Sequence, residues 1–269
     1  MSGEFDIEAL DLGAYLRRIG VPAAPAPGTS GLEALHFGHA TRVPFENLDI
    51  LLGRRIRLDM ASLLAKLVRA ERGGYCFEHN LLFAAALERS GFTVTRLAAR
   101  VRTDTARLLP RTHMTLLVEC DGRRWLCDVG FGADTPLHPV PFGEGEVRPQ
   151  FGRSYRAVRE GDAWVLQLSR QGTWTDLYAF TLEPQHLVDY EMANHFTSTW
   201  SESPFVQKLT AQLPRPQVRL ALRGLELTEN RGASVATRVL SGDDELLEVL
   251  ASRFGLRFPP GTRFKTPDR

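Results

Sequence analysis

The segment ERGGYCFEHN, residues 71–80, contains a glycine pair, a cysteine and the start of an apolar helical pattern. The glycines allow a sharp turn, and the helix that follows offers unpaired N–H groups and the positive end of its dipole close to Cys76. This setting favours a reactive thiolate, yet buried cysteines are more often inert packing residues. The segment by itself leaves Cys76 open as a nucleophile, a packing residue or a metal ligand.

The composition is that of a globular protein with little net charge. The chain has 269 residues, 43% hydrophobic and 24% charged, and a formal net charge of +1. So small a charge argues against bulk binding to nucleic acid or to an anionic membrane. No uncharged apolar run approaches the roughly 20 residues of a membrane span, and the N-terminal segment lacks the features of a signal peptide.

The chain has three cysteines and no secretory signal, which fits free thiols in a reducing compartment. We therefore predict a cytoplasmic protein with neither nucleic acid nor a membrane as partner. No oligomeric state follows from the sequence.

Residues 1–90 have the periodicity of helices. Apolar residues recur at helical spacing in four segments, each ending at or near a glycine or proline. The predicted helices span residues 6–20, 28–43, 59–74 and 76–91. The last of them begins at Cys76, so this part of the chain is expected to be a helical bundle that carries the cysteine.

After Gly91 the pattern changes to short β-rich runs, separated by turn sequences such as DG, EGD and QG. Six strands are predicted, at residues 92–102, 113–120, 123–131, 154–160, 163–170 and 175–182. Their spacing favours an antiparallel barrel or sandwich. The last part has a helical connector at 184–199, strands at 217–224, 225–230 and 236–241, and a helix at 243–255.

One predicted hairpin brings two chemically active side chains together. Its strands pair through the Asp-Gly turn at 121–122, and a two-residue loop places Thr115 opposite Asp128. His113 and Asp128 then become diagonal neighbours on one face, with backbones roughly 7–8 Å apart, close enough for imidazole and carboxylate to meet. A three-residue loop would place them on opposite faces.

Cys76, His113 and Asp128 would then act as nucleophile, base and orienting group. Asp128 would hold one tautomer of His113, and His113 would accept the thiol proton. A lone histidine at the start of an apolar strand is otherwise more often a packed residue.

A metal site is the other possibility for the cysteines. Four residues would have to supply the thiolate and imidazole ligands: Cys76, His79, Cys120 and Cys127. The sequence lacks CxxC, HExxH or any other paired spacing of a structural zinc site. We further expect Cys120 and Cys127 on opposite faces of the hairpin, and so predict no metal.

Five segments, in chain order, resemble the arylamine N-acetyltransferases. RGGYCFE at 72–78 matches the family pattern RGGxCxE, HMTLLV at 113–118 matches HxxLxV, and DVGFG at 128–132 is identical to the aspartate motif. VPFENL at 43–48 and NHFTSTWSESPF at 194–205 also look like the family. The likeness covers nearly the whole chain and is loose after residue 205.

The resemblance implies an α+β fold in four parts. These are an N-terminal helical bundle with the nucleophile, 1–90; a central antiparallel β-barrel with the histidine and aspartate, 91–184; an interdomain helical connector, 185–204; and a C-terminal α/β lid, 205–269. It implies a cysteine-protease-like triad of Cys76, His113 and Asp128. It also implies a ping-pong reaction, in which acetyl-CoA acetylates Cys76 and an arylamine, arylhydroxylamine or hydrazine then takes the acetyl group.

The resemblance also implies residues that contact the two substrates. The acceptor pocket would be walled by Phe45, Phe131 and Phe205. The coenzyme would lie along Thr112, Gly130, Phe131 and Gly132. Arg72 and Glu78 are expected to brace the site rather than to touch substrate.

Three other functions remain open on the sequence alone. An amide synthase of the same scaffold would take its acyl chain from a carrier protein instead of acetyl-CoA. A cysteine hydrolase or a transglutaminase-like protein would use the same triad, and a non-catalytic scaffold would keep the fold without the reaction.

Overall fold

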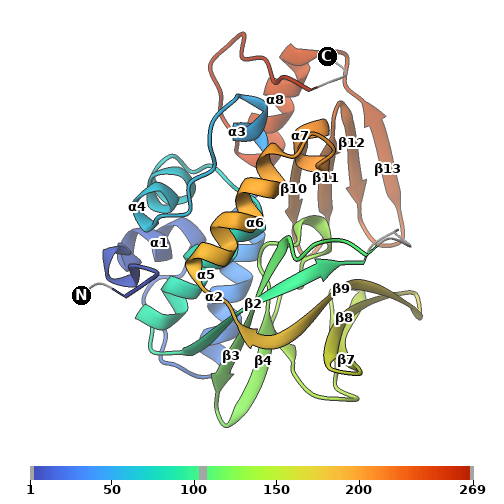
Figure 1. The fold of residues 1–269 in the computed structure, drawn as a ribbon. Coiled ribbons are helices and arrows are strands. Elements are labelled where there is room, and N and C mark those ends of the chain that lie inside the picture. Colours follow the sequence, from blue (N-terminus) through green and yellow to red (C-terminus); the bar gives the residue numbers. More distant parts are fainter. Residues whose placement is uncertain (1–2, 103–107, 267–269) are drawn as a thin grey trace.

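A helical region, an eight-stranded sheet and a five-stranded sheet make up this computed structural model, which describes residues 3–102 and 108–266 (Figure 1). The helical region contains η1 (Ile7–Ala9), α1 (Leu12–Ile19), α2 (Thr29–Arg42), α3 (Leu48–Leu51), α4 (Met60–Leu63), η2 (Leu64–Arg69) and α5 (Cys76–Arg89). Further along the chain come η3 (Gly132–Asp134), α6 (Leu187–Thr199), α7 (Pro204–Gln207) and α8 (Asp243–Phe254).

α5 is the central element of the helical region. It begins at Cys76, as predicted, and every residue from Cys76 to Leu87 is buried. The helix packs on one side against α2 and on the other against the strands of the larger sheet. Its small residues at 84–86 allow this contact on all sides.

Two of the predicted helices differ from the observed ones. The segment 6–20 is divided into η1 and α1, because the Asp11 side chain accepts the N–H of Ala14 at 2.9 Å and starts a new helix. The segment 59–74 ends early, at Arg69, after a π-helical turn. Gly74 forms a parallel bridge with Phe45, and a Cβ on Gly73 would lie 1.8 Å from the Pro44 carbonyl oxygen, so this glycine pair belongs to extended chain.

The larger sheet is antiparallel, with the strand order β5-β4-β3-β2-β9-β8-β7-β6. Its strands are β2 (Thr93–Val101), β3 (His113–Cys120), β4 (Arg123–Cys127), β5 (Val140–Pro141), β6 (Val147–Gln150), β7 (Arg153–Glu160), β8 (Ala163–Arg170) and β9 (Thr173–Pro184). The end strands β5 and β6 lie near each other, so the sheet nearly closes into a barrel. The six predicted strands are confirmed; β5 and β6 were missed because such short strands leave no alternating pattern.

The β3–β4 hairpin has the predicted register. Leu117 pairs with Leu126 and Cys120 with Arg123 across a two-residue turn. The prediction that Cys120 and Cys127 lie on opposite faces of the hairpin is wrong. Residues two apart on a strand share a face, and Leu116 pairs with Cys127, so both cysteines lie on the same face.

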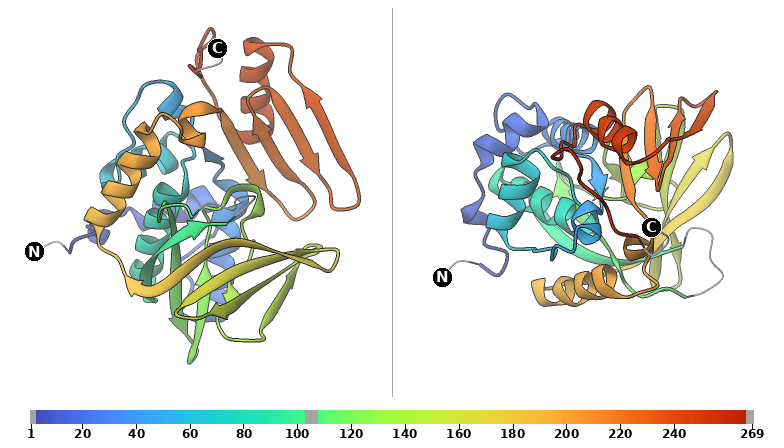
Figure 2. Two further views of the ribbon diagram at one scale, coloured as in Figure 1. Left: turned by 45° about the vertical axis from the view of Figure 1, so that its right-hand side comes forward. Right: turned by 90° about the horizontal axis from the view of Figure 1, so that it is seen from above.

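The smaller sheet has the order β1-β10-β11-β12-β13, and α8 packs against it on the side of the helical region (Figure 2). Its strands are β1 (Phe45–Glu46), β10 (Thr210–Pro214), β11 (Arg219–Arg223), β12 (Glu226–Asn230) and β13 (Val235–Val239). β1 comes from the N-terminal region, and Leu48 and Leu51 lie in the hydrophobic core of this sheet. The division into four parts at 90, 184 and 204 therefore stays a proposal.

Candidate active site

Cys76 is the first residue of α5, and its side chain is buried, with 3% of its surface exposed. The thiol donates a weak hydrogen bond to the backbone carbonyl oxygen of Thr112, at 3.6 Å. Thr112 directly precedes β3, so the sulfur lies beside the strand that His113 begins. A thiol at the first position of a helix is also close to the positive end of the helix dipole.

His113 and Asp128 meet as the hairpin register predicts. Nε2 of His113 lies 2.7 Å from Oδ2 of Asp128, and both side chains are almost fully buried. Burial alone would lower the pKa of His113, but the charge and hydrogen bond of Asp128, together with Cys76, raise the pKa to about 10. Since Asp128 occupies Nε2, Nδ1 is the ring atom left for Cys76. The imidazole is thus held as a cation at neutral pH.

Asp128 is held by donors on its other oxygen. Oδ1 accepts the side-chain amide of Asn80 at 3.1 Å and the backbone N–H of Gly130 at 2.8 Å. Burial opposes ionisation, but His113 and these hydrogen bonds lower the pKa of Asp128. Asn80 also donates to the Met114 carbonyl oxygen at 2.7 Å. Sequence reasoning gave Asn80 no role, although its place one helical turn after Cys76 on α5 was a signal.

A cavity of about 770 Å³ opens over the sulfur. It is lined by Cys76, His113, Thr112, Gly130 and the rings of Phe45, Phe131 and Phe205, among others. The ring centroids of Phe45 and Phe205 lie 5.9 Å apart, and those of His113 and Phe131 lie 5.0 Å apart. The three predicted aromatic residues therefore surround the space next to the thiol.

Two glycines of the DVGFG motif have packing roles. A Cβ on Gly130 would lie 2.9 Å from the Cα of Cys76, so the absence of a side chain there lets the hairpin approach α5. Gly132 is buried and is not among the residues that line the cavity. Its φ of +69° and the nearness of Gln212 leave no room for a side chain.

The chain is similar to known proteins over nearly its whole length. A family model described as N-acetyltransferase matches residues 30–261. A relative named arylamine N-acetyltransferase, from Mycolicibacterium smegmatis, is 39% identical over 254 residues, which is 92% of each chain. The chain belongs to the arylamine N-acetyltransferase family.

Solved structures of the family have the same fold. The arylamine N-acetyltransferase of Nocardia farcinica aligns with a TM-score of 0.89 and 40% identity, covering 96% of this chain and 93% of its own. The Mycobacterium marinum enzyme, solved in complex with CoA, aligns with a TM-score of 0.86 and 35% identity, covering 91% and 93%. These likenesses support the predicted α+β fold.

In this member of the family, a buried charge cluster braces the segment before Cys76. Arg72 donates to Oε1 of Glu46 at 2.6 and 3.0 Å, which ties the RGG segment to β1. Glu78 accepts the backbone N–H of Tyr75 at 3.1 Å and the ammonium of Lys66 at 2.8 Å. Burial raises the pKa of Glu78 to about 7, although Lys66 pulls the value down. Arg72 and Glu78 thus hold the chain on both sides of the nucleophile and do not line the cavity.

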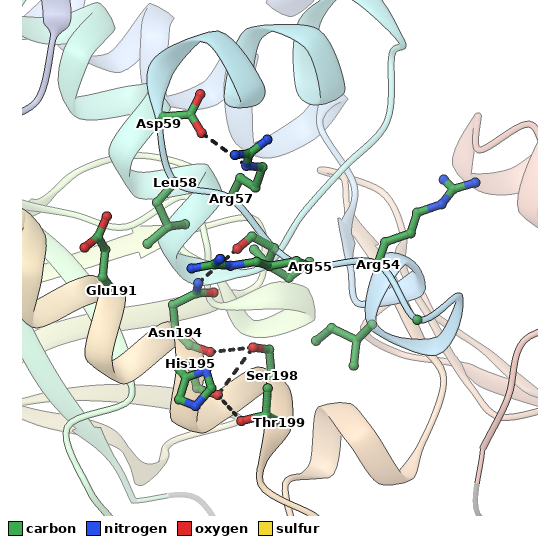
Figure 3. A pocket seen from close by; sticks show the side chains of 13 residues that line it. Arg54, Arg55, Arg57, Leu58, Asp59, Glu191, Asn194, His195, Ser198 and Thr199 are labelled. Atoms are coloured by element: carbon green, nitrogen blue, oxygen red, sulfur yellow. Dashed lines mark hydrogen bonds and ion pairs between the residues drawn. The ribbon is translucent and has the colours of Figure 1, made fainter.

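Figure 3 shows a second cavity, lined by residues of loop 53–59 and of α6. Its volume is about 690 Å³, and it shares no lining residue with the first. Loop 53–59 and one face of α6 form its walls, and Asn194 joins them by donating to the Ile56 carbonyl oxygen at 3.2 Å. The hydroxyl of Tyr75, the residue before Cys76, is hydrogen-bonded to the side chain of Asn194. Asn194 therefore ties α6 to the start of α5.

The described part of the chain has neither a metal-binding cluster nor a membrane-spanning helix. No group of three or more His, Cys, Asp or Glu side chains there is arranged to hold a metal ion. No helix within residues 3–102 and 108–266 has the length and apolarity of a membrane span.

Proposed function

We propose that this protein acetylates arylamines, arylhydroxylamines or hydrazines with acetyl-CoA, through an acetyl group held on Cys76. One observation carries the proposal: Cys76 begins α5 beside His113, whose Nε2 lies 2.7 Å from Oδ2 of the buried Asp128, and both Cys76 and His113 line one aromatic cavity. A thiol, an imidazole and a buried carboxylate in this order form an activated nucleophile.

In the first half-reaction the thiolate of Cys76 attacks the thioester carbonyl carbon of acetyl-CoA. The bond from that carbon to the coenzyme sulfur breaks, and the CoA thiolate takes a proton from the His113 imidazolium. The N–H groups at the start of α5 would stabilise the negative charge that develops on the carbonyl oxygen. One thioester replaces another, so the acetyl group stays activated without ATP.

In the second half-reaction the amine nitrogen attacks the acetyl-cysteine. His113 accepts the proton that the amine loses, and the Cys76 thiolate leaves and re-forms the ion pair with the imidazolium. Aromatic amines are largely unprotonated at neutral pH and keep the lone pair that this attack requires. The rings of Phe45, Phe131 and Phe205 offer such an acceptor apolar and edge-to-face contacts.

The coenzyme would enter along the residues predicted from the sequence. Thr112 and Gly130 line the cavity beside the sulfur, and Phe131 adjoins His113. Gly132, one residue further, would contribute only its backbone. These roles remain proposals.

The same cavity also has cations suited to the coenzyme's phosphates. Lys208 and Arg223 line it, and neither side chain forms an ion pair within the part of the chain that the structure describes. The carboxylates of the cavity, Asp134 and Asp176, already have arginine partners. Two exposed, uncompensated cations favour a polyanion over a neutral ligand.

Replacing Lys208 and Arg223 by alanine is expected to raise the KM for acetyl-CoA about three- to tenfold each, because each removes one charged contact to phosphate. Steady-state kinetics with p-nitrophenyl acetate, a donor without phosphate, should give unchanged constants. Arg215→Ala, an exposed cation outside the cavity, is the matched control. An equal loss with both donors would contradict the phosphate role.

Intact-protein mass spectrometry tests the proposed function most directly. Mixing the protein with acetyl-CoA alone should add one acetyl group, about 42 Da, and peptide mapping should locate it on Cys76. Adding anisidine or a hydrazide should then discharge the adduct. A protein that gains no mass at millimolar acetyl-CoA would not be an acetyl-CoA-dependent transferase.

The comparisons favour acetyl-CoA over a carrier-protein donor. The relatives that match nine tenths of the chain, from M. smegmatis and Escherichia coli, are named arylamine N-acetyltransferases, and the M. marinum structure contains CoA. The amide synthase considered from the sequence has no such support. The cytoplasmic location stays a prediction.

A further inference from the structure

His36 lies in the interior, on α2, and both of its ring nitrogens contact the chain that follows β4. Its Nδ1 is 3.2 Å from the carbonyl oxygen of Leu137, and its Nε2 is 3.2 Å from the backbone nitrogen of Asp128. A carbonyl only accepts and a backbone amide only donates, so these two contacts select one tautomer. Nδ1 carries the proton, and Nε2 offers its lone pair to Asp128.

The histidine is neutral in this place. Burial, with His138 as a minor contributor, lowers the pKa of His36 to about 4, against the weaker opposing effects of the Leu137 carbonyl and Asp128. His39, three residues along α2, is also held neutral by burial, which lowers its pKa. A neutral ring is what the contact with Asp128 requires, since a cation would turn a second N–H toward the amide.

The Asp128 amide has no partner within the sheet. The β3–β4 ladder ends at the pair Leu116 and Cys127, one residue before Asp128. A buried N–H without an acceptor is destabilising, and here His36 is the acceptor. The same residue is held from the opposite side by Asn80 of α5, which binds its carboxylate.

We propose that His36 is a positioning residue, whose neutral Nε2 fixes the backbone of Asp128 and thereby aims the carboxylate at His113. α2 thus holds the main chain of the aspartate, while α5 holds its side chain. The proposal rests on the proposed function only for the turnover assay. The reactivity of Cys76 tests it even if no acetyl group is transferred.

Three variants test the proposal. His36→Phe keeps the ring and its edge contact with Phe83, at 5.6 Å between centroids, but removes the acceptor. His36→Gln retains one donor and one acceptor in the same side chain. His138→Phe is the matched control, because that ring packs in a cluster with Phe37 and Phe151 and, within the described residues, has no hydrogen bond or ring contact with the triad.

In His36→Phe, kcat with acetyl-CoA and the rate of iodoacetamide alkylation of Cys76 at pH 7 should both fall about 10- to 100-fold, the usual effect of losing a supporting hydrogen bond. KM should stay within about twofold, and His36→Gln should recover most of both rates. His138→Phe should match the parent. A folded His36→Phe protein with the parent's kcat and alkylation rate would overturn the proposal, as would a folded Gln variant as slow as the Phe variant.

The unmodified protein gives a test that does not depend on how the variants fold. Nitrogen-15 NMR of histidine-labelled protein at pH 7 should show His36 neutral, with the proton on Nδ1 and Nε2 bare. A proton on Nε2 would mean that the ring cannot accept from Asp128, and would overturn the proposal by itself.

Discussion

Cys76→Ala is expected to lose acetyl transfer from acetyl-CoA to an arylamine by about 10⁴-fold or more. The sulfur is the only atom in the cavity that the proposed mechanism makes covalent, and residues of a catalytic triad act as one unit, so no neighbour replaces it. The fold should persist, because the change removes a single buried atom at the start of α5. The measurement is CoA release in a steady-state assay, with near-UV circular dichroism to confirm the fold.

The matched control is Cys120→Ala, a partly buried thiol on the hairpin outside the cavity. It should keep the parent rate, which would show that removing a thiol elsewhere does not abolish acetyl transfer. Cys76→Ala with more than about 1% of the parent activity would mean that acetyl transfer bypasses this residue, and the ping-pong mechanism would be wrong.

Asp128→Asn is expected to lower kcat by about 10³- to 10⁴-fold with little change in the fold. The oxygen of the new amide keeps the hydrogen bonds from Asn80 and Gly130, so its N–H₂ group must face Nε2 of His113. Nε2 then has to accept, and the ring proton moves to Nδ1, the atom beside Cys76. The base is thus already protonated yet uncharged, and it can neither take the thiol proton nor stabilise the thiolate.

Two rates measure this effect. Both kcat with acetyl-CoA and the rate of iodoacetamide alkylation at pH 7 should fall, because the imidazolium that the carboxylate maintains is lost. Asp162→Asn, on an exposed turn between β7 and β8, serves as the control and should match the parent in both. A variant that retains a tenth of the parent's kcat would leave Asp128 with a structural role only.

The sequence predicted the parts of the site that depend on local rules. The hairpin register follows from the two-residue turn and the alternation of side chains, and it correctly brought His113 and Asp128 together. The start of α5 at Cys76 followed from the glycine pair and the apolar period. The reaction itself came from the resemblance, not from these rules.

Contacts between distant segments were beyond local rules. His36 and Asp128 are 92 residues apart, and nothing in the helix that contains His36 distinguishes a hydrogen-bonded histidine from a packed one. The pairing of β1 with β10 was missed for the same reason, since two residues give no period. The division of segment 6–20 depended on one aspartate cap inside an otherwise regular pattern.

The pairing of β1 with β10 also limits how chimeras between this enzyme and its homologues can be designed. The hydrophobic core between the smaller sheet and α8 is not made of C-terminal residues alone. Leu48 and Leu51, from the N-terminal region, are part of it. A chimera that exchanges only residues after 205 would place a foreign sheet against a native edge strand and two native leucines. Grafts between homologues should therefore move residues 45–51 together with the C-terminal segment, as a discontinuous cassette.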